Sequence, residues 1–213
     1  MSKGTVYLIP MPIGSNTAED VMPSAVVQST IALKFFIVEN VKTTRRYLRK
    51  LDRTFPIDKS TFFELNKKTD KSELRSFLTP ALNGENIGIL SEAGCPGIAD
   101  PGAEIVALCH EYGIEVHPYV GPSSILLALM ASGFSGQEFT FHGYLPKERK
   151  ERIFHLKKFE QDTRKRGVTH LFMDTPFRNM NVLEDLLNEL SDVTLVSIAS
   201  NITADDQKIK TMS

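Results

Sequence analysis

Apolar and polar residues follow one another in a repeating order along the first 120 residues. A short apolar run is followed by turn residues and then by a stretch in which apolar positions recur at helical spacing. This order is typical of strands and helices that alternate in a parallel-sheet protein. The apolar runs predict strands at 5–9, 35–38, 61–65, 87–90 and 115–118. The stretches between them predict helices at 18–33, 43–53, 71–83 and 103–112. Pro80 should kink or restart the third of these helices, because proline lacks an N–H.

A second set of elements begins after Gly121 and Pro122. The apolar run 125–131 predicts a helix that ends at Gly133. Beyond it we predict strands at 138–143, 169–174 and 193–199, and helices at 148–164 and 179–190. The expected fold is therefore α/β with two lobes, a parallel-sheet N-terminal lobe over 1–120 and a smaller mixed-sheet C-terminal lobe over 121–213. The chain ends at Ser213 in a polar stretch that predicts no final strand, which leaves open that the second lobe is incomplete at its C-terminus.

Composition changes this picture little. Of the 213 residues, 41% are hydrophobic and 24% are charged, so the chain is expected to fold around a core of its own. The formal net charge of −1 creates no global field toward nucleic acid or a membrane. We expect neither DNA nor a membrane as a partner, although the net charge by itself does not decide this. A polyanion would need a local basic patch, and two basic runs offer one, although charged helices also simply face water. These runs contain Lys42, Arg45, Arg46, Arg49, Lys50 and Arg53, and then Lys147, Arg149, Lys150, Arg152, Lys157, Lys158, Arg164, Lys165 and Arg166.

The two cysteines, Cys95 and Cys109, argue against metal and disulfide chemistry. Neither has the spacing of a zinc ligand set or of a disulfide framework, so no metal site is expected. Cys109 and His110 would point in different directions on a helix, which makes them a poor nucleophile and base pair. The apolar run 6–9 is cut by prolines, far short of a signal segment or a membrane span, so a cytoplasmic protein is expected.

Three turns rich in glycine and proline each follow a predicted strand, which is where open parallel sheets bind ligands. The common fingerprints GxGxxG, GxxxxGK[ST] and GxSxG do not occur in the sequence, so nucleotide and hydrolase sites of those kinds are not expected. The first turn, 10–15, offers Pro10, Pro12 and Gly14. The second, 91–102, offers Ser91, Glu92, Ala93, Gly94 and Pro96. The third, 120–124, offers Gly121, Pro122, Ser123 and Ser124.

Each turn has a chemical and a structural interpretation. A glycine such as Gly94 lets the backbone approach a ligand or take a positive φ, and Glu92 can accept hydrogen bonds from hydroxyl or ammonium groups. Asp100 and Pro101 suit the N-cap and N1 positions of the next helix. The exposed N–H groups where a helix opens near Ser124 fit a carboxylate, although a serine there is also an ordinary cap. The first turn by itself would suit any edge strand.

Six segments of the chain resemble one known family. SEAGCPGIADPG (91–102) resembles SDAGTPLISDPG, a motif of the tetrapyrrole methylase superfamily in the branch of the ribosomal small-subunit RNA 2′-O-ribose methyltransferase I enzymes. YLIPMPIGS resembles the opening Y-IVPTPIGN of that branch, and FIVENVKTTRRYL is similar to I-AEDTR-T--LL. The other matches, in chain order, are VGPSSILLALMASGF with PGPSA---AL-ASG, FTFHGYLPK with F-F-GFLP-K, and LFMDTPFRNMNVLEDL with IFYESPHR----L-DL. Together they cover nearly the whole chain.

The resemblance implies a two-lobed α/β enzyme that binds S-adenosylmethionine in the cleft between its lobes, normally as a homodimer. The three turns would hold the cofactor, and ribosomal RNA or the small ribosomal subunit would be the partner. A ribose hydroxyl is a weak nucleophile, so its methylation would profit from a base or an electrostatic clamp. The candidates are Glu39, Glu64 and Asn66 at predicted strand ends, with Arg45 as a phosphate or substrate contact. A carboxylate at a strand end is also a routine turn partner.

Three departures from the family pattern bear on the site. The acidic pair after the second strand reads Glu39-Asn40, and the loop that relatives fill with a His and acidic residues reads ELNKKT over 64–69. Both changes lie on the substrate side, whereas Glu92 replaces the usual Asp on the cofactor side. Two alternatives therefore stay open. One is a methyltransferase of the same fold that acts on a tetrapyrrole-like small molecule or a protein, and the other is a non-catalytic RNA-binding protein.

Overall fold

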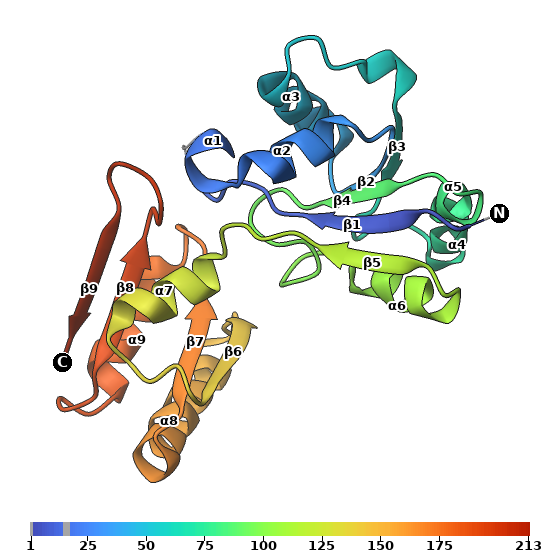
Figure 1. Cartoon of the computed structure of the whole chain (residues 1–213). Helices are drawn as coiled ribbons and strands as arrows, with labels where there is room; N and C mark the ends of the chain where they lie inside the picture. Colours follow the sequence, from blue (N-terminus) through green and yellow to red (C-terminus); the bar gives the residue numbers. More distant parts are fainter. Residues whose placement is uncertain (1, 15–17) are drawn as a thin grey trace. The chain divides into compact units, whose positions relative to one another are not determined.

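The computed structural model describes residues 2–14 and 18–213, so Ser15, the last residue of the first turn, lies outside the described residues. Its contacts divide the chain into two compact units, one ending at Ser123 and the other beginning at Ser124 (Figure 1). Compactness does not test whether either unit folds alone, so the domain limits 1–120 and 121–213 stay a prediction. Within the described ranges, no helix is long and apolar enough to cross a membrane.

The first unit is built on a sheet of parallel strands. In sheet order these are β3 (Thr61–Glu64), β2 (Phe35–Val38), β4 (Ile87–Leu90), β1 (Thr5–Ile9) and β5 (Glu115–Pro118). The register pairs Leu90 with Ile9 on one side and with Val38 on the other. The predicted α/β class with a parallel sheet is confirmed, and each of these strands was predicted to within one residue of its ends.

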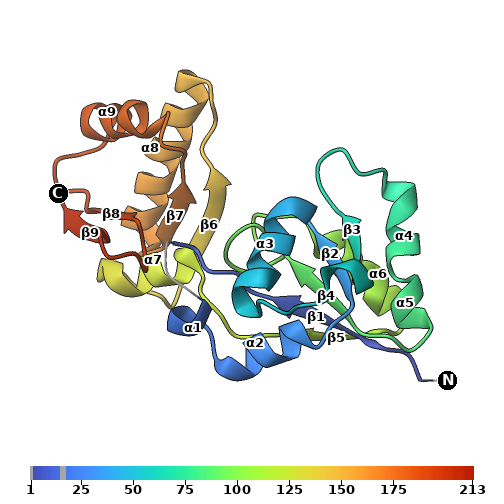
Figure 2. The same ribbon diagram turned by 90° about the horizontal axis from the view of Figure 1, so that it is seen from above.

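Side chains alternate between the two faces of this sheet, and each face carries its own core. On one face, buried Phe36 and Val38 pack with helices α2 (Ser24–Ile31) and α3 (Val41–Leu51). On the other face, buried Ile37 packs with α4 (Leu74–Phe77), α5 (Thr79–Leu82) and α6 (Ala103–Glu111). Figures 1 and 2 show α2 and α3 on one side of the sheet and α6 on the other. This two-sided cover explains why the strands read as almost continuous apolar runs.

Prolines decide where two of the predicted helices break. The single helix predicted over 18–33 is wrong: α1 (Ala18–Val21) stops short, and Pro23 is the N-cap of α2, since proline has no N–H to continue a helix. The pattern over 71–83 forms a 3-10 turn (Lys71–Glu73) followed by α4 and α5. The expected restart at Pro80 is confirmed, because Pro80 lies in the first turn of α5. Another 3-10 turn spans Ile57–Lys59.

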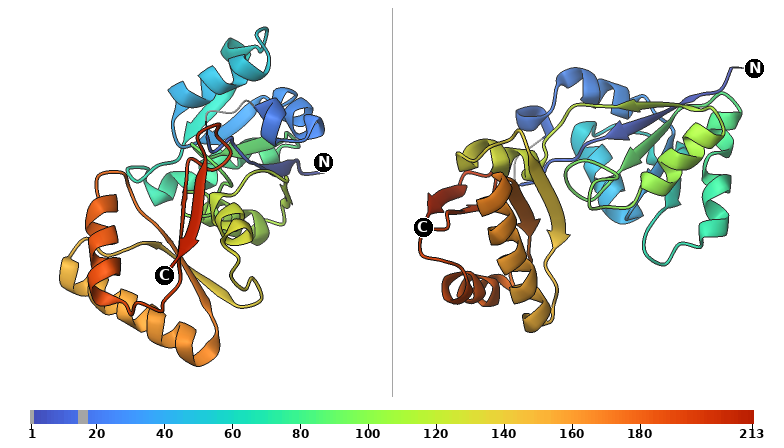
Figure 3. Two further views of the ribbon diagram at one scale, coloured as in Figure 1. Left: turned by 90° about the vertical axis from the view of Figure 1, so that its left-hand side faces the viewer. Right: turned by 90° about the horizontal axis from the view of Figure 1, so that it is seen from below.

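The second unit contains two separate pairs of strands. β6 (Phe139–Tyr144) and β7 (Thr169–Met173) run parallel, and β8 (Val196–Ser200) and β9 (Lys208–Met212) form an antiparallel hairpin. Its helices are α7 (Ser124–Ser132), α8 (Arg149–Arg166) and α9 (Asn179–Glu189). Figure 3 shows the long helix α8 beside β6 and β7, and the hairpin at the end of the chain. A small core of Leu145, Leu156, Phe159 and Val182 joins α8 to α9.

The prediction that the polar end of the chain forms no strand is wrong, because β9 lies there. β9 pairs with β8 from Lys208 opposite Ser200 to Met212 opposite Val196. Only Ile209 and Met212 are half-buried in this strand, so its apolar signal is too weak to stand out in the sequence. The second lobe therefore has parallel and antiparallel pairing, as expected of a mixed arrangement, but in two sheets and not in a single one.

Candidate functional site

Neighbouring strands of a parallel sheet end at the same edge, so the loops that follow them start side by side. In the first unit, β4 lies between β2 and β1. The loops that leave these three strands contain Glu39, the second turn and the first turn of the sequence prediction. This carboxyl edge is therefore the candidate site.

The first and second turns are joined through their backbones. The N–H of Met11 donates to the carbonyl of Gly94 at 2.8 Å, and the N–H of Gly94 donates to the carbonyl of Met11 at 3.0 Å. Gly94 has a φ of +72°, and a Cβ there would lie 3.3 Å from Cγ2 of Ile13. Both the conformation and the space at this crossing therefore favour glycine.

The third turn contacts the other two. A Cβ on Gly121 would lie 2.3 Å from Cβ of Pro10, and the thiol of Cys95 donates to the carbonyl of Pro122 at 3.5 Å. The structure thus brings residues 10–14, 91–102 and 120–123 of the three predicted turns together within the first unit. The Ser91 hydroxyl is buried and donates to the carbonyl of Ala93 at 3.2 Å. The remaining predicted residues divide by exposure: Pro96 is buried, Pro12 and Ser123 are half-buried, and Gly14, Glu92 and Ser124 are exposed.

Three carboxyl groups interact at the carboxyl ends of β2 and β4. Burial raises the pKa of Glu39, Glu92 and Asp100. Each pKa is raised further by a neighbouring carboxylate: Asp100 acts on Glu39, Glu39 on Glu92, and Glu92 on Asp100. Three effects oppose the shifts. The charge of Lys67 and a hydrogen bond from the backbone N–H of Glu92 lower the pKa of Glu39, and a hydrogen bond from the Thr43 hydroxyl lowers the pKa of Glu92. Like charges held this close favour a cationic ligand.

Asp100 does not have the capping role that its position suggested. The N-cap of α6 is Gly102, which has a φ of +136°, and no side chain caps the helix there. A Cβ on Gly102 would lie 3.3 Å from the backbone nitrogen of Gly97, so the chain crosses itself closely at this point. The loop consequently continues two residues beyond Asp100, and the Asp100 carboxyl interacts with the other two acids instead.

The other predicted substrate-side residues do not join these acids. The amide of Asn66 donates to the carboxylate of Glu64 at 2.7 Å and accepts from the N–H of Lys68 at 2.8 Å, which closes a local turn. Arg45 lies over the ring of Phe62 with its guanidinium carbon 5.2 Å from the ring centre. No ion pair or hydrogen bond within the described chain links Glu64, Asn66 or Arg45 to Glu39.

Sequence reasoning missed Thr43, Lys67 and the role of Asp100. Thr43 lies in the first turn of α3 and its partner Glu92 is in a distant segment of the sequence, so no local spacing points to this contact. Asn40, the residue that replaces an acid of the family pattern, is the N-cap of α3 and accepts from the N–H groups of Lys42 and Thr43 at 2.9 and 3.2 Å. The loop containing Lys67 has no local signal either.

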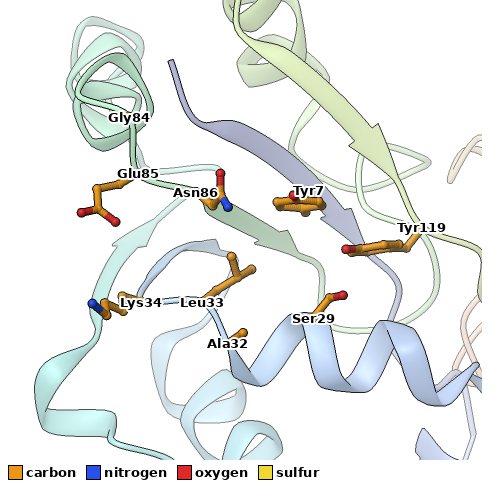
Figure 4. A pocket seen from close by; sticks show the side chains of 9 residues that line it. All are labelled: Tyr7, Ser29, Ala32, Leu33, Lys34, Gly84, Glu85, Asn86 and Tyr119. Atoms are coloured by element: carbon orange, nitrogen blue, oxygen red, sulfur yellow. The ribbon is translucent and has the colours of Figure 1, made fainter. Parts of the chain in front are cut away.

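Two cavities lie elsewhere. One, of about 340 Å³, is lined by residues of β1, α2 and the segments before β4 and after β5, where the rings of Tyr7 and Tyr119 stack 5.3 Å apart (Figure 4). The other, of about 530 Å³, lies among mostly apolar side chains of α8, β7 and β8 in the second unit. Neither contains a predicted site residue, so the candidate site is an assembly of loops and not one of these hollows.

Comparison with known proteins assigns the class to which this fold and these loops belong. The family model for tetrapyrrole (corrin/porphyrin) methylases matches residues 32–213, and the chain belongs to this family of methyltransferases. Solved structures of the same fold include the methyltransferase CobJ, with a TM-score of 0.61 at 18% identity over 100% of this chain and 86% of that chain. The cobalt precorrin-4 methyltransferase CbiF gives a TM-score of 0.62 at 14% identity over 98% of this chain and 85% of that one.

The sequence relatives carry a more particular name. The chain is 31% identical over 202 residues to the ribosomal RNA small subunit methyltransferase I of Escherichia coli O157:H7, covering 95% of this chain and 66% of the relative. It is 31% identical over 200 residues to the enzyme of that name from Synechocystis, covering 94% and 67%. The Bacillus subtilis protein of that name is 32% identical over 189 residues, covering 89% and 61%. The chain thus spans about two thirds of the length of these relatives, and the resemblance seen in the motifs is confirmed.

Proposed function

We propose that this chain is an S-adenosylmethionine-dependent methyltransferase that modifies the 2′-hydroxyl of a ribose in small-subunit ribosomal RNA. Membership of a methyltransferase family and the names of the relatives support the reaction and the RNA class. The observation that carries the proposal is the meeting of three glycine- and proline-rich turns beside the carboxyls of Glu39, Glu92 and Asp100. The same resemblance predicts a homodimer, which sedimentation equilibrium of the whole chain would test.

The residues present fit this cofactor. S-adenosylmethionine carries a sulfonium and an ammonium, and the three acids with raised pKa values would be relieved by positive charge. Glu92 is exposed at the loop and can accept from ammonium or ribose hydroxyl groups. Gly94 and Gly121 let the three turns pack closely on one another, and the N–H and hydroxyl groups of Ser123 and Ser124 suit a carboxylate.

The bound cofactor would supply a methyl group already activated by its sulfonium. The protein's own residues would align the nucleophile with that group and exclude water from it. We assign Glu39 as the base, which takes the ribose hydroxyl proton at its carboxylate. Its raised pKa makes it a stronger proton acceptor than an ordinary glutamate, and it lies directly after β2 at the edge where the turns meet. Glu64 is a weaker candidate, because its exposed carboxylate is bound by Asn66.

Titration calorimetry of the whole chain with S-adenosylhomocysteine tests the cofactor assignment. We expect saturable binding by the wild type. Absence of saturable binding would contradict both this proposal and the alternative of a same-fold methyltransferase with another substrate.

Transfer of labelled methyl to isolated small ribosomal subunits, compared with free tetrapyrrole precursors, tests the substrate. We expect label in the RNA only. Glu39→Gln should lower the transfer rate on the order of 10²–10⁴-fold without a similar loss of S-adenosylhomocysteine affinity, whereas Glu64→Gln should stay close to the wild type. Label in the precursors would support the tetrapyrrole alternative. Cofactor binding with transfer to neither substrate would support a non-catalytic RNA-binding protein.

A further inference from the structure

Helix α3 presents a row of positive charges on its outward side. Its buried residues, Thr44, Tyr47 and Leu48, face the sheet. The exposed positions recur at spacings of three and four, which places them on the opposite side of the helix. We name this surface the α3 basic face, and it consists of Lys42, Arg45, Arg46, Arg49, Lys50 and, just past the helix, Arg53.

Acidic neighbours do not neutralise the α3 basic face. Within the described chain, none of its six side chains forms an ion pair within 4.0 Å. The acid that follows the helix, Asp52, accepts from the N–H and the hydroxyl of Thr54, both at 2.7 Å, and these bonds lower its pKa more than the charge of Arg49 does. Arg45 is held over Phe62 and keeps its charge available at the surface.

The second basic run of the sequence behaves differently. On α8, Arg149 and Arg152 pair with the buried Asp185 at 2.8 and 2.7 Å, and Lys157 pairs with Glu189 at 2.8 Å. Arg164 and Arg166 also pair with acids of their own unit. Much of the positive charge on α8 is therefore paired with acidic side chains of the second unit, whereas that on α3 is not paired among the described residues.

The position of the α3 basic face suits a strand that enters the candidate site. α3 begins at Val41, two residues after Glu39, and Thr43 in its first turn donates to Glu92. At 1.5 Å per residue the helix runs for roughly 16 Å from this edge. Phosphates lie about 3.4 Å apart along the axis of a duplex strand, so a face of this length can contact several successive phosphates. Lys67, close enough to affect Glu39, adds a cation at the near end.

From this contrast we propose that the α3 basic face binds the phosphates of RNA that flank the ribose presented to Glu39. The inference rests on the proposed function and adds the surface that would hold the substrate. Contacts to phosphate release counterions, so binding weakens linearly with the logarithm of salt concentration, with a slope near −0.7 per contact for single strands. The slope therefore counts contacts and separates a binding surface from a helix that only faces water.

The test compares two triple variants of the whole chain with equal loss of charge. The α3 variant is Arg46→Gln/Lys50→Gln/Arg53→Gln, and the α8 control is Lys150→Gln/Lys158→Gln/Lys165→Gln. All six positions are exposed. Fluorescence anisotropy with a labelled single-stranded RNA, repeated over a range of salt concentrations, measures affinity and slope for each.

We expect the α3 variant to bind on the order of tenfold or more weakly at low salt, with a slope smaller by about 2 than that of the wild type. The α8 control should keep the wild-type slope. An unchanged slope in the α3 variant, or an equal change in both variants, would overturn the inference.

Two further measurements separate this inference from the proposed function. S-adenosylhomocysteine affinity and thermal unfolding should be the same in the α3 variant and the wild type, because none of the three replaced residues belongs to the site. If the wild type methylates RNA but the α3 variant binds RNA with the same salt dependence as the wild type, the inference alone fails. If the wild type binds S-adenosylhomocysteine but no RNA at low salt, both the inference and the RNA substrate fail.

Discussion

Gly121 lies against the ring of Pro10 so closely that a Cβ on the glycine would be 2.3 Å from Cβ and 2.6 Å from Cγ of the proline. The two residues follow neighbouring strands, β1 and β5, but are more than a hundred positions apart in the sequence. The ring of Pro10 and the backbone of Gly121 cannot rotate away from each other as a flexible side chain could. The contact therefore ties the position of the third turn to that of the first.

Replacing Gly121 by alanine tests this tie. Because the added carbon overlaps the Pro10 ring, the turn must shift, at a cost of about 1–3 kcal/mol in the free energy of unfolding. S-adenosylhomocysteine should bind on the order of tenfold more weakly. Gly136→Ala is the control, since a Cβ there meets only Cδ2 of Leu129 at an ordinary 3.8 Å. Calorimetry and urea unfolding measure both effects, and equal behaviour of the two variants would show that the turn adapts freely.

Gly94→Val should abolish cofactor binding. The new side chain would fill the crossing of the first two turns, near Ile13, at a φ of +72° that valine avoids. Gly113→Val is the matched control, because Gly113 also has a positive φ of +59° but lies after α6, away from the turns. Both variants should lose about 1–3 kcal/mol of stability through backbone strain. Only Gly94→Val should lose S-adenosylhomocysteine affinity, and retained affinity would contradict the site.

Glu92→Gln should make the protein more stable and less able to bind cofactor. A carboxyl whose folded pKa is raised contributes stability that is full below its unfolded pKa and is lost as the pH rises through the folded pKa. Burial and Glu39 raise the pKa of Glu92 above 4.5, so the charged form strains the fold at neutral pH. The amide should raise Tm at pH 7 by less than about 4 °C, the shift that about 1 kcal/mol gives in a chain of this size.

The stability difference should shrink as the pH falls through the raised pKa of Glu92, where the wild-type carboxyl also becomes neutral. Differential scanning calorimetry over a pH series measures it. Glu73→Gln, at an exposed position before α4, is the control and should show no such trend. A Glu92→Gln variant that is less stable than the wild type at neutral pH would refute repulsion among the three acids.

Asp185 should be the most sensitive charged position of the second unit. Its carboxylate is buried, yet hydrogen bonds from Arg149 and Arg152 outweigh the opposing effect of burial and lower its pKa. Asp185→Ala leaves Arg152 buried without its partner and should cost about 3–5 kcal/mol. Glu184→Ala removes the same charge from an exposed neighbour and should change stability little. Urea unfolding followed by circular dichroism compares the two, and similar losses would contradict a structural role for the pair.

Local pattern accounts for most of the elements. The apolar runs located the strands of the first unit because both faces of that sheet are covered, and Pro80 marked the restart of a helix. Pro23 breaks another predicted helix by the same physical rule. The strand at 208–212 was missed because it alternates charged and half-buried residues at an edge and has no run of apolar side chains.

The candidate site likewise has features that the sequence predicts and features that only the structure shows. Residue types and motif order, read from the sequence alone, were enough to predict a methyltransferase family, the three turns and the carboxyls after β2 and β4, because these depend on short strings. Only the tertiary structure decided that Asp100 joins Glu39 and Glu92 and does not cap α6, and that Glu64 binds Asn66 instead of joining them. It also decided which basic run stays free, since Asp185 and Glu189, which pair with Arg152 and Lys157 of α8, lie on α9. Charge and hydrogen bonding act through space, and the distances that set them arise from strand order and helix packing, which no local pattern contains.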